Sequence, residues 1–418
     1  MEKILLRNIE NPRSADIKEY IKNGGYKDLL LALKMQPGEI IEEVKRSGLR
    51  GRGGSGFPTG LKWEVALRDP KSPKYLICNA DEGEPGTFKD RLIMEKNPHL
   101  LIEGMIIAGY AIKAEYGYIY LRGEYPYVKK ILSRTIKEAY DKGYLGEDIM
   151  GRGVKFHIKL YQGAGAYICG EETALIESIE GKRGQPRIKP PFPASTGVWG
   201  MPSVVNNVET LSNIPYIIEI GATAYLKIGT PECPGPKLYC VSGHVKRPGV
   251  YELPMGTTLR EIIYTHAGGV RDGKRLKAVI PGGISTPILP PQNIDCTMDF
   301  VNMPRYGSAL GSGAIIVMDE TVCLLKVCER ALRFFAHESC GKCTPCRIGT
   351  KRMLETIQRI LRGAERDEDI ESLLELGSVM DAASFCPLGQ TAPNLVISTI
   401  NHFREEFESH IKEGRCPS

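Results

Sequence analysis

Residues 154–177 read Val154-Lys-Phe-His-Ile-Lys-Leu-Tyr161, then Gln162-Gly-Ala-Gly-Ala-Tyr-Ile-Cys-Gly170, then Glu171-Glu-Thr-Ala-Leu-Ile-Glu177. The first part alternates apolar and polar side chains, which predicts a strand, and the glycine run predicts a turn that leads into a helix. A strand, a glycine turn and a helix in this order are typical of an α/β domain, in which ligands bind beyond the carboxyl ends of parallel strands.

The same alternation extends upstream. Residues 74–79 and 116–122 are predicted strands, and residues 98–113 and 126–142 are predicted helices between or after them. Such an order predicts a parallel, Rossmann-like sheet with right-handed crossovers. Further along, we expect a short helix from Val205 to Ile214.

Changes in composition and in hydrophobic periodicity along the chain predict four segments or domains. Residues 1–65 form a lead-in of short helices that ends in a glycine-rich loop, and residues 66–236 form the Rossmann-like domain. Residues 237–320, with short strands near 239–243, 249–253, 277–280 and 314–318 and a helix at 257–266, predict a ubiquitin-like β-grasp domain. Residues 321–418 predict a helical bundle, with helices at 322–337, 347–363, 367–380 and 391–412.

Three cysteines stand at two-residue spacings in Glu338-Ser-Cys340-Gly-Lys-Cys343-Thr-Pro-Cys346, and Cys386 is followed by proline. A triplet with a remote Cys-Pro is typical of a [4Fe–4S] cluster. Structural zinc, which prefers separated pairs, and a disulfide framework are the alternatives. We expect the remaining cysteines to be unliganded: Cys78, Cys169, Cys233, Cys240, Cys296, Cys323, Cys328 and Cys416.

Three other segments suggest a binding site. Gly51-Arg-Gly53-Gly-Ser-Gly56 matches the dinucleotide pattern only formally, because a helix and not a strand is predicted before it. The acidic loop Asn79-Ala-Asp81-Glu82-Gly-Glu84 follows the first strand, and Glu171 and Glu172 open the helix after the glycine turn at 163–170. Carboxylates there would repel a pyrophosphate, so this turn is expected to hold ribose hydroxyls or ring nitrogens. Asn206 and Asn207 precede a helix suited to a terminal phosphate.

The composition excludes several classes of protein. The chain has 418 residues, 55 basic and 50 acidic, and 42% hydrophobic residues, which predicts soluble domains with ordinary cores and no nucleic-acid footprint. No apolar run is long enough for direct membrane insertion, and the start resembles no export signal. Scattered cysteines then favour a reducing, cytoplasmic location.

Four motifs occur together and in order. They are Arg50-Gly-Arg-Gly-Gly-Ser-Gly-Phe-Pro-Thr-Gly-Leu-Lys-Trp63, Asn79–Arg91, Gly163–Ser178 and Glu338–Arg347. The combination resembles the NADH-oxidising, F-type subunit of respiratory complex I, NADH:quinone oxidoreductase, over nearly the whole chain. The resemblance implies bound FMN, NADH as substrate, and one [4Fe–4S] cluster on Cys340, Cys343, Cys346 and Cys386.

The resemblance also implies roles for single residues, with no residue acting as a catalytic base because FMN and NADH carry the hydride transfer. The flavin phosphate would lie near Lys62, Asn206, Asn207 and Thr210. The ribityl chain and ring would lie near Gly53, Asn79, Asp81 and Glu171. Phe57 and Phe192 would stack on adenine, although each could be a packing residue. The remaining residues expected around the cofactors are Glu82, Glu84, Tyr167, Gly170, Glu172 and Lys189.

Partners and alternatives follow from the same resemblance. A thioredoxin-like [2Fe–2S] subunit of the E type and a large multi-cluster subunit of the G type would receive the electrons, with the assembly peripheral to the inner membrane. The diaphorase subunit of an NAD-linked hydrogenase or formate dehydrogenase shares all four motifs, but its frequent Cys-rich extensions are not seen in this sequence. A more distant alternative is a zinc-stabilised adaptor without enzymatic activity.

Overall fold

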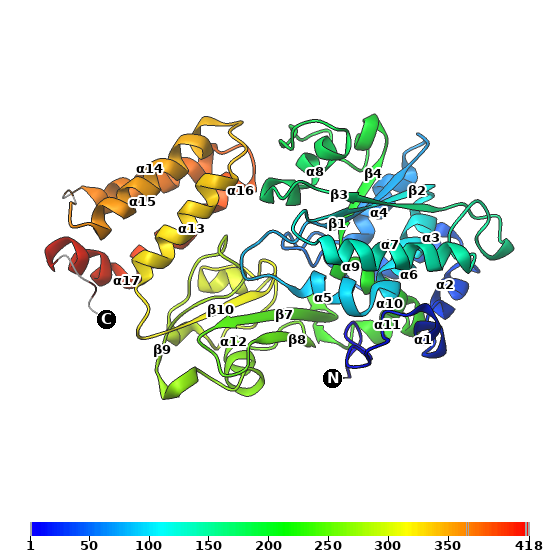
Figure 1. Ribbon diagram of the computed structural model, residues 1–418, viewed down its shortest axis with the longest axis horizontal. Helices are drawn as coiled ribbons and strands as arrows, with labels where there is room; N and C mark the ends of the chain where they lie inside the picture. Colours follow the sequence, from blue (N-terminus) through cyan, green and yellow to red (C-terminus); the bar gives the residue numbers. More distant parts are fainter. Residues whose placement is uncertain (1, 365, 367, 414–415, 417–418) are drawn as a thin grey trace. The chain divides into compact units, whose positions relative to one another are not determined.

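The computed structural model describes residues 2–364, 366, 368–413 and 416 (Figure 1). The chain divides into two compact units, each described separately below. Unit 1 comprises Met1–Gly83, Phe88–Leu238 and Glu252–Gly256, and unit 2 comprises Glu84–Thr87, Tyr239–Tyr251 and Thr257–Ser418. Since each unit is made of several segments, the chain passes repeatedly from one unit to the other.

Unit 1 is built on a four-stranded sheet in the order β3-β2-β1-β4, in which all pairs are parallel. Its strands are β1 Tyr75–Ala80, β2 Tyr116–Leu121, β3 His157–Gln162 and β4 Ser203–Asn207. The two central strands are largely buried, as expected of a parallel sheet covered by helices. The predicted Rossmann-like architecture is therefore confirmed.

Helices connect these strands. Between β1 and β2 lie α5 Lys89–Lys96 and α6 Pro98–Ile112, and α6 is buried along nearly its whole length. The amphipathic α7 Pro126–Asp141 connects β2 to β3, and α8 Glu172–Ile179 follows the glycine turn after β3. The loops after β1 and β3, together with the start of α9 Val208–Ser212, therefore stand where a parallel sheet positions its ligand site.

The prediction of one secondary-structure element is wrong. The helix predicted from Val205 to Ile214 is divided, because residues 203–207 form the edge strand β4, with Val204 opposite Leu76 and Val205 opposite Ile77 of β1. The apolar run is too short to distinguish a buried strand from a helix by periodicity. Helix α9 begins only at Val208, after Asn207 caps it, and α10 Ile214–Ile220 follows.

The remainder of unit 1 is mainly helical and includes the predicted short helices of the lead-in. Glu252, far along the chain, accepts backbone N–H groups from Ile4 at 2.8 Å, Leu5 at 2.9 Å and Leu6 at 2.9 Å. A single buried carboxylate thus fastens the N-terminal segment. The other elements are α1 Ile17–Lys22, α2 Lys27–Ala32, α3 Pro37–Arg46, α4 Thr59–Arg68, α11 Ala222–Tyr225, β5 Gly229–Thr230, β6 Cys233–Pro234 and the 3₁₀ turns Ile149–Gly151, Tyr167–Gly170 and Val198–Gly200.

Unit 2 begins with a mixed sheet in the order β8-β7-β10-β9, in which β10 runs parallel to β7 and antiparallel to β9. A short helix, α12 Leu259–Glu261, continues as a π-helical turn over Ile262–His266. A mixed sheet with one helix agrees with the predicted β-grasp domain. Its strands are β7 Pro236–Gly243, β8 Gly249–Pro254, β9 Leu276–Ile280 and β10 Ala314–Asp319, although residues 236–238 of β7 and 252–254 of β8 are counted with unit 1. Turns of 3₁₀ type lie at Arg271–Gly273, Pro291–Asn293 and Met303–Tyr306.

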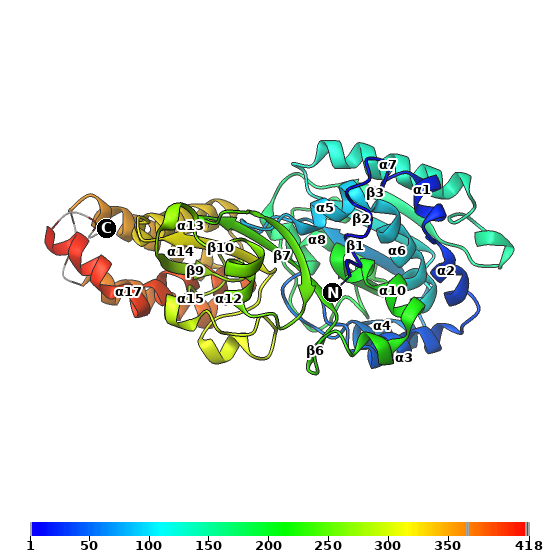
Figure 2. The ribbon, with the colours of Figure 1, turned by 90° about the horizontal axis from the view of Figure 1, so that it is seen from below.

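The predicted helices at the C-terminal end of unit 2 are present, and α13, α14, α15 and α17 pack on one another (Figure 2). A short α16 precedes α17, whose backbone leaves helical geometry at Phe403. Residue 367, where one helix was predicted to begin, lies outside the described residues. No described helix combines the length and apolar character needed to cross a bilayer. The bounds are α13 Leu324–Glu338, α14 Thr344–Leu361, α15 Asp369–Ala383, α16 Pro387–Thr391 and α17 Asn394–Glu413.

Candidate functional site

The loops after β1 and β3 of unit 1 are joined by Asn79. Its Nδ2 donates to the carbonyl of Gly170 at 2.9 Å, and its Oδ1 accepts the backbone N–H of Asp81 at 3.1 Å. Hence Asn79, Asp81 and Gly170 lie together at the carboxyl end of the sheet. The acidic loop after β1 and the glycine turn after β3 therefore face each other.

Two lysines neutralise the carboxylates at the start of α8. Lys189 Nζ contacts Glu171 at 2.7 Å and Glu172 at 3.0 Å, and Lys62 Nζ contacts Glu172 at 3.1 Å and the carbonyl of Val205 at 3.1 Å. Burial raises the pKa of Glu172, but Lys62 and Lys189 outweigh it and bring the pKa below its usual value. Burial likewise lowers the pKa of Lys189, while the two glutamates raise it above the ordinary value. Both shifts favour the charged forms of Glu172 and Lys189.

Glu171 also closes the N-terminus of α8, since its side chain accepts the backbone N–H groups of Thr173 and Ala174, each at 2.9 Å. These are the donors that an anion would otherwise bind at a helix start. The start of α8 is consequently not available to a phosphate, in agreement with the expectation drawn from the sequence.

Asn206 and Asn207 lie at the end of β4 with their side chains held. Asn206 Oδ1 accepts the indole N–H of Trp63 at 2.8 Å, and Asn207 Nδ2 donates to Asp90 Oδ2 at 2.6 Å. A Cβ atom on Gly53 would lie 3.1 Å from Asn207 Cβ, so a side chain at Gly53 would fill the space beside Asn207. Next to it, Thr210 Oγ1 accepts the backbone N–H of Arg52 at 2.9 Å. The glycine-rich loop therefore packs against the start of α9.

A buried ion-pair network lies beneath this region. Lys89 Nζ is 2.8 Å from Asp90 Oδ1 and 2.8 Å from Glu209 Oε2, and Lys237 Nζ is also 2.8 Å from Glu209 Oε2. All four side chains are at most 4% exposed. Burial raises the pKa of Glu209, but Lys237 and Lys89 outweigh it and hold the pKa below its usual value. Sequence reasoning missed this network; the only local sign of it was the adjacent Lys89 and Asp90.

Glu82 has a structural role. Its carboxylate accepts the backbone N–H groups of Asp90 at 2.8 Å and Arg91 at 2.9 Å and the hydroxyl of Tyr125 at 3.2 Å, so it caps α5. Burial, with Asp90 nearby, raises the pKa of Glu82 to about 7. The carboxylate of this predicted cofactor-binding residue is thus occupied by backbone donors.

The other predicted residues take different positions. Glu84 belongs to unit 2, where its Oε1 accepts both the backbone N–H and the hydroxyl of Ser285 at 2.9 Å. Tyr167 begins a 3₁₀ turn and packs close to Gly83. Phe57 and Phe192 are 51% and 58% exposed. Exposed aromatic rings of this kind are free to stack on a planar ligand and are not part of the core.

In unit 2 the bundle brings the predicted metal ligands together. Cys343 occupies the N-cap position of α14, Cys346 lies in the first turn of that helix, and Cys386 occupies the N-cap position of α16. The backbone N–H of Phe385 is 3.5 Å from Cys343 Sγ, and a Cβ atom on Gly389 would lie 2.8 Å from Cys346 Cβ. The loop that carries Cys386 therefore lies directly against the loop of the triplet.

The electrostatics of the thiols agree with this proximity. Burial raises the pKa of Cys386 to about 11, and Cys340 and Cys346 contribute to the increase. Burial also raises the pKa of Cys346, as do Cys343 and Cys340. Four thiolates are the donor set of a [4Fe–4S] cluster, so the chemistry of these residues fits the cluster.

Models of three families match the chain. The Nuo51 FMN-binding domain matches residues 44–216, an SLBB domain matches residues 237–317, and the NADH-ubiquinone oxidoreductase-F iron–sulfur binding region matches residues 326–410. The first model includes the loops of the sheet edge. The third includes all four cysteines of the candidate cluster site.

Two similar proteins are named as F-type subunits of NADH-quinone oxidoreductase. The protein from Rhizobium meliloti, the second of that type by its name, is 50% identical over 417 residues, covering 100% of this chain and 99% of the relative. The protein from Aquifex aeolicus is 49% identical over 411 residues, covering 98% and 95%.

Hydrogenase subunits are similar as well. The NADP-reducing hydrogenase subunit HndC of Solidesulfovibrio fructosivorans is 47% identical over 408 residues, covering 98% of this chain and 83% of that protein. A crystal structure of an NAD⁺-reducing [NiFe]-hydrogenase in the H₂-reduced state superposes with a TM-score of 0.86 at 37% identity, covering 99% of this chain and 67% of the other. The fold, the sheet-edge loops, the four cysteines and the full-length similarity agree, and the chain belongs to the family of F-type subunits of NADH-quinone oxidoreductase.

Proposed function

We propose that this chain is the electron-input subunit of a respiratory complex I. It binds FMN and a [4Fe–4S] cluster and oxidises NADH. The observation that carries the proposal is the presence in one chain of the FMN-binding sheet edge and the four-cysteine site, with about half of all residues identical to an F-type relative over the full length.

When bound, FMN would supply acceptance of a hydride from NADH, and the cluster would supply transfer of single electrons, so that a two-electron donor feeds one-electron carriers. The protein supplies position and charge. In unit 1 we assign Lys62, Asn206, Asn207 and Thr210 to the flavin phosphate. Their support is structural: three of them lie at the β4–α9 junction, and Lys62 donates to the carbonyl of Val205 there.

The ribityl chain and ring are assigned to Gly53, Asn79, Asp81 and Glu171, and the hydrogen bonds of Asn79 keep that part of the site in shape. Lys189, Glu172 and Tyr167 are assigned to the dinucleotide, with Phe57 and Phe192 stacking on adenine. Glu82 would act on the site only through the start of α5, which it caps. For Glu84 we propose a contact with the nicotinamide half of the dinucleotide.

Anaerobic titration tests the proposal. We expect purified holoprotein to hold one FMN and about four irons per chain. Addition of NADH should bleach the flavin absorption and produce the EPR signal of a reduced cluster. A preparation with full flavin and iron that NADH does not bleach, or that is bleached without cluster reduction, would contradict the proposal.

We also propose the partners. A thioredoxin-like [2Fe–2S] subunit of the E type and a large multi-cluster subunit of the G type would accept the electrons, in an assembly peripheral to the inner membrane. The similarity to HndC and to the [NiFe]-hydrogenase structure supports the second candidate, a hydrogenase diaphorase. Coexpression of the chain with each partner set distinguishes them: copurification with the E-type and G-type proteins supports complex I, and copurification only with hydrogenase subunits supports the diaphorase.

A further inference from the structure

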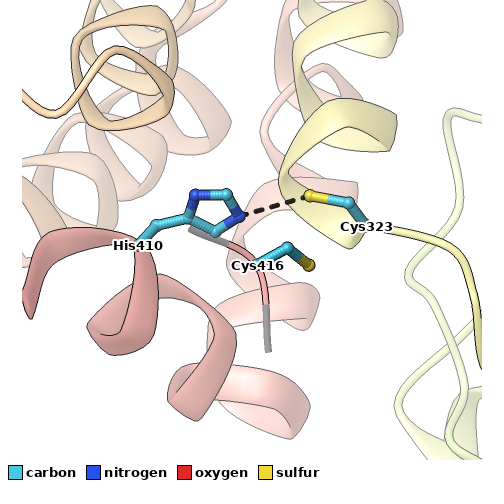
Figure 3. A group of neighbouring side chains, drawn as sticks. All are labelled: Cys323, His410 and Cys416. Carbon is cyan, nitrogen blue, oxygen red and sulfur yellow. Dashed lines mark hydrogen bonds between the residues drawn. The ribbon is translucent and has the colours of Figure 1, made fainter. Parts of the chain in front are cut away.

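A second group of metal-ligating side chains lies in unit 2, outside the proposed cluster site. Cys323 Sγ, one imidazole nitrogen of His410 and Cys416 Sγ all lie within 4.8 Å of one another (Figure 3). Cys323 caps the N-terminus of α13, His410 is in the last turn of α17, and Cys416 follows that helix. The start of α13 and the end of α17 therefore bring three possible metal-ligand atoms together.

The geometry agrees with one metal ion. In tetrahedral zinc sites the metal lies about 2.3 Å from sulfur and 2.0–2.1 Å from nitrogen, which separates the donor atoms by roughly 3.6–3.8 Å. Here Cys323 Sγ and His410 Nε2 are 3.3 Å apart, and all separations are below 4.8 Å. Small rotations of the side chains are therefore enough to place an ion between them.

Packing orients these ligands. His410 is only 5% exposed, so its ring is held by the surrounding bundle. Glu406, one turn earlier on α17, is engaged elsewhere, because its carboxylate accepts the backbone N–H of Leu324 at 3.0 Å and pairs with Lys277. Glu406 is therefore not the fourth ligand, and a water molecule or an added ligand would complete the coordination.

We propose that Cys323, His410 and Cys416 bind one zinc ion through two thiolates and one imidazole. Soft sulfur with imidazole is a donor set that zinc prefers over magnesium or calcium. Such an ion would link Cys416 and α17 to the start of α13. It would be separate from the cluster on Cys340, Cys343, Cys346 and Cys386.

The test uses holoprotein with its cluster intact, so that iron occupies the other four cysteines. After incubation with zinc and desalting, elemental analysis should find about one zinc per chain in the wild type. His410→Ala and Cys323→Ser should lose at least nine-tenths of it. His402→Ala is the matched control, because His402 is an exposed histidine on the same helix, and it should retain the zinc.

A second variant distinguishes the loss of a metal ligand from misfolding of the helical bundle. Cys416 lies beyond the end of α17 and is partly exposed, so Cys416→Ser leaves the packed helices unchanged. We expect it to keep flavin and iron and to lose zinc. With cobalt in place of zinc, the wild type should show sulfur-to-cobalt charge-transfer absorption, which should be absent from Cys416→Ser because that variant does not hold the metal.

Three results would overturn the proposal. The first is wild-type holoprotein that retains no zinc. The second is zinc that is equally abundant in the wild type and in His410→Ala. The third is a Cys323–Cys416 disulfide, found by alkylation and mass spectrometry in protein purified without oxygen, which would make the two thiols a redox pair.

Discussion

The two cofactor regions are built in different ways. In the cysteine region of unit 2, three of the four proposed ligands lie within residues 340–346, and burial raises the pKa of two of the four thiols. In the sheet-edge region of unit 1, the residues proposed to hold the flavin extend from Gly53 to Thr210, and most of their polar side chains are bound to other side chains or to the backbone. The cysteine region therefore offers side chains that would bond directly to metal, whereas the sheet edge offers groups that are already fixed by hydrogen bonds within the protein.

The difference reflects what each cofactor contributes. A cluster forms four metal–sulfur bonds and so supplies much of its own binding free energy, which means that its ligands need few contacts with one another. A flavin is held by many weak contacts, so the protein must keep those groups in place beforehand. Substitution of a cysteine in the cysteine region should therefore abolish cluster binding outright without affecting the flavin. Substitutions at the sheet edge should weaken cofactor binding by degrees.

The largest effect is expected for Cys343→Ser. Removing one of four ligands should abolish the EPR signal of the reduced cluster and most of the bound iron, because serine is a poor ligand for iron in such a cluster. Flavin should stay bound, since its proposed residues lie in unit 1. Reduction of ferricyanide by NADH should persist while transfer to the physiological acceptors is lost.

Cys296→Ala serves as the control for this variant, because Cys296 is a buried thiol of unit 2 outside both groups of cysteines. It should retain iron, flavin and electron transfer. Loss of flavin in Cys343→Ser would show that the two regions depend on each other, and the contrast between them would no longer hold.

The second effect concerns the network beneath the sheet edge. Glu209→Leu removes the buried carboxylate that Lys89 and Lys237 share, and breaking a buried ion pair in this way costs about 3–5 kcal/mol. We expect a corresponding fall in the urea midpoint of flavin release. The double variant Glu209→Leu/Lys237→Met should recover part of the loss, because Lys89 keeps its contact with Asp90.

Arg404→Ala provides the comparison for an ion pair at the surface, since Arg404 and Glu371 are 47% and 65% exposed. Its cost should be at most about 1 kcal/mol. If Glu209→Leu cost no more than Arg404→Ala, the network would have no role in holding the start of α9.

The third prediction concerns Asp28, a buried carboxylate of unit 1 whose pKa is raised and not lowered. Burial, with Glu103 and Glu219 nearby, raises the pKa of Asp28 to about 7. The folded chain then binds this proton more tightly than the unfolded chain, whose carboxyl has a pKa near 4. Stability therefore falls as the pH rises from about 4 to about 7, and the loss is complete above that range.

Asp28→Asn should remove this pH-dependent loss of stability, because asparagine does not ionise. We expect the melting temperature of the wild type, relative to that of the variant, to decrease between pH 5 and pH 8, with a change in free energy of about 2–3 kcal/mol. The same measurement on Asp16→Asn is the control, because backbone hydrogen bonding lowers the pKa of that exposed carboxyl. Parallel curves for the wild type and Asp28→Asn would contradict the assignment.

The smallest effect is expected for Phe192→Ala. An exposed ring makes little difference to the fold, but loss of a stacking contact worth about 0.5–1.5 kcal/mol should raise the KM for NADH about two- to tenfold. The content of FMN should not change. Trp199→Ala, which removes another exposed ring of unit 1, should leave KM as it is. Equal changes in both variants would assign Phe192 a packing role.

How much could be read from the sequence depended on how local each signal was. The spacing of Cys340, Cys343 and Cys346 is visible in one short run, and the strand and helix periods of the sheet were long enough to be predicted. The strand at Val204 and Val205 was misread because its apolar run is short and its pairing with β1 is not encoded nearby. Cys323 and His410 are 87 residues apart, so no spacing pattern joins them.

The same limit applies to charges. No local pattern joins Lys89 to Lys237 in the sequence, and only the fold shows that both bind Glu209. Assignment of individual flavin contacts rested on family resemblance, since glycine loops occur in many kinds of site. Patterns within about ten residues were thus predictable, and pairings across the chain were not.

The attachment of the N-terminal segment has a consequence for biosynthesis. Ile4 is separated by 248 residues from the carboxylate of Glu252 that holds its backbone. At roughly 5–20 residues per second, a ribosome needs on the order of 12–50 s to make the intervening chain. During that time the backbone groups of the first few residues must remain in water. Nascent chains released before Glu252 has emerged would lack this attachment, and their exposed N-terminal ends would be early targets for proteases and chaperones.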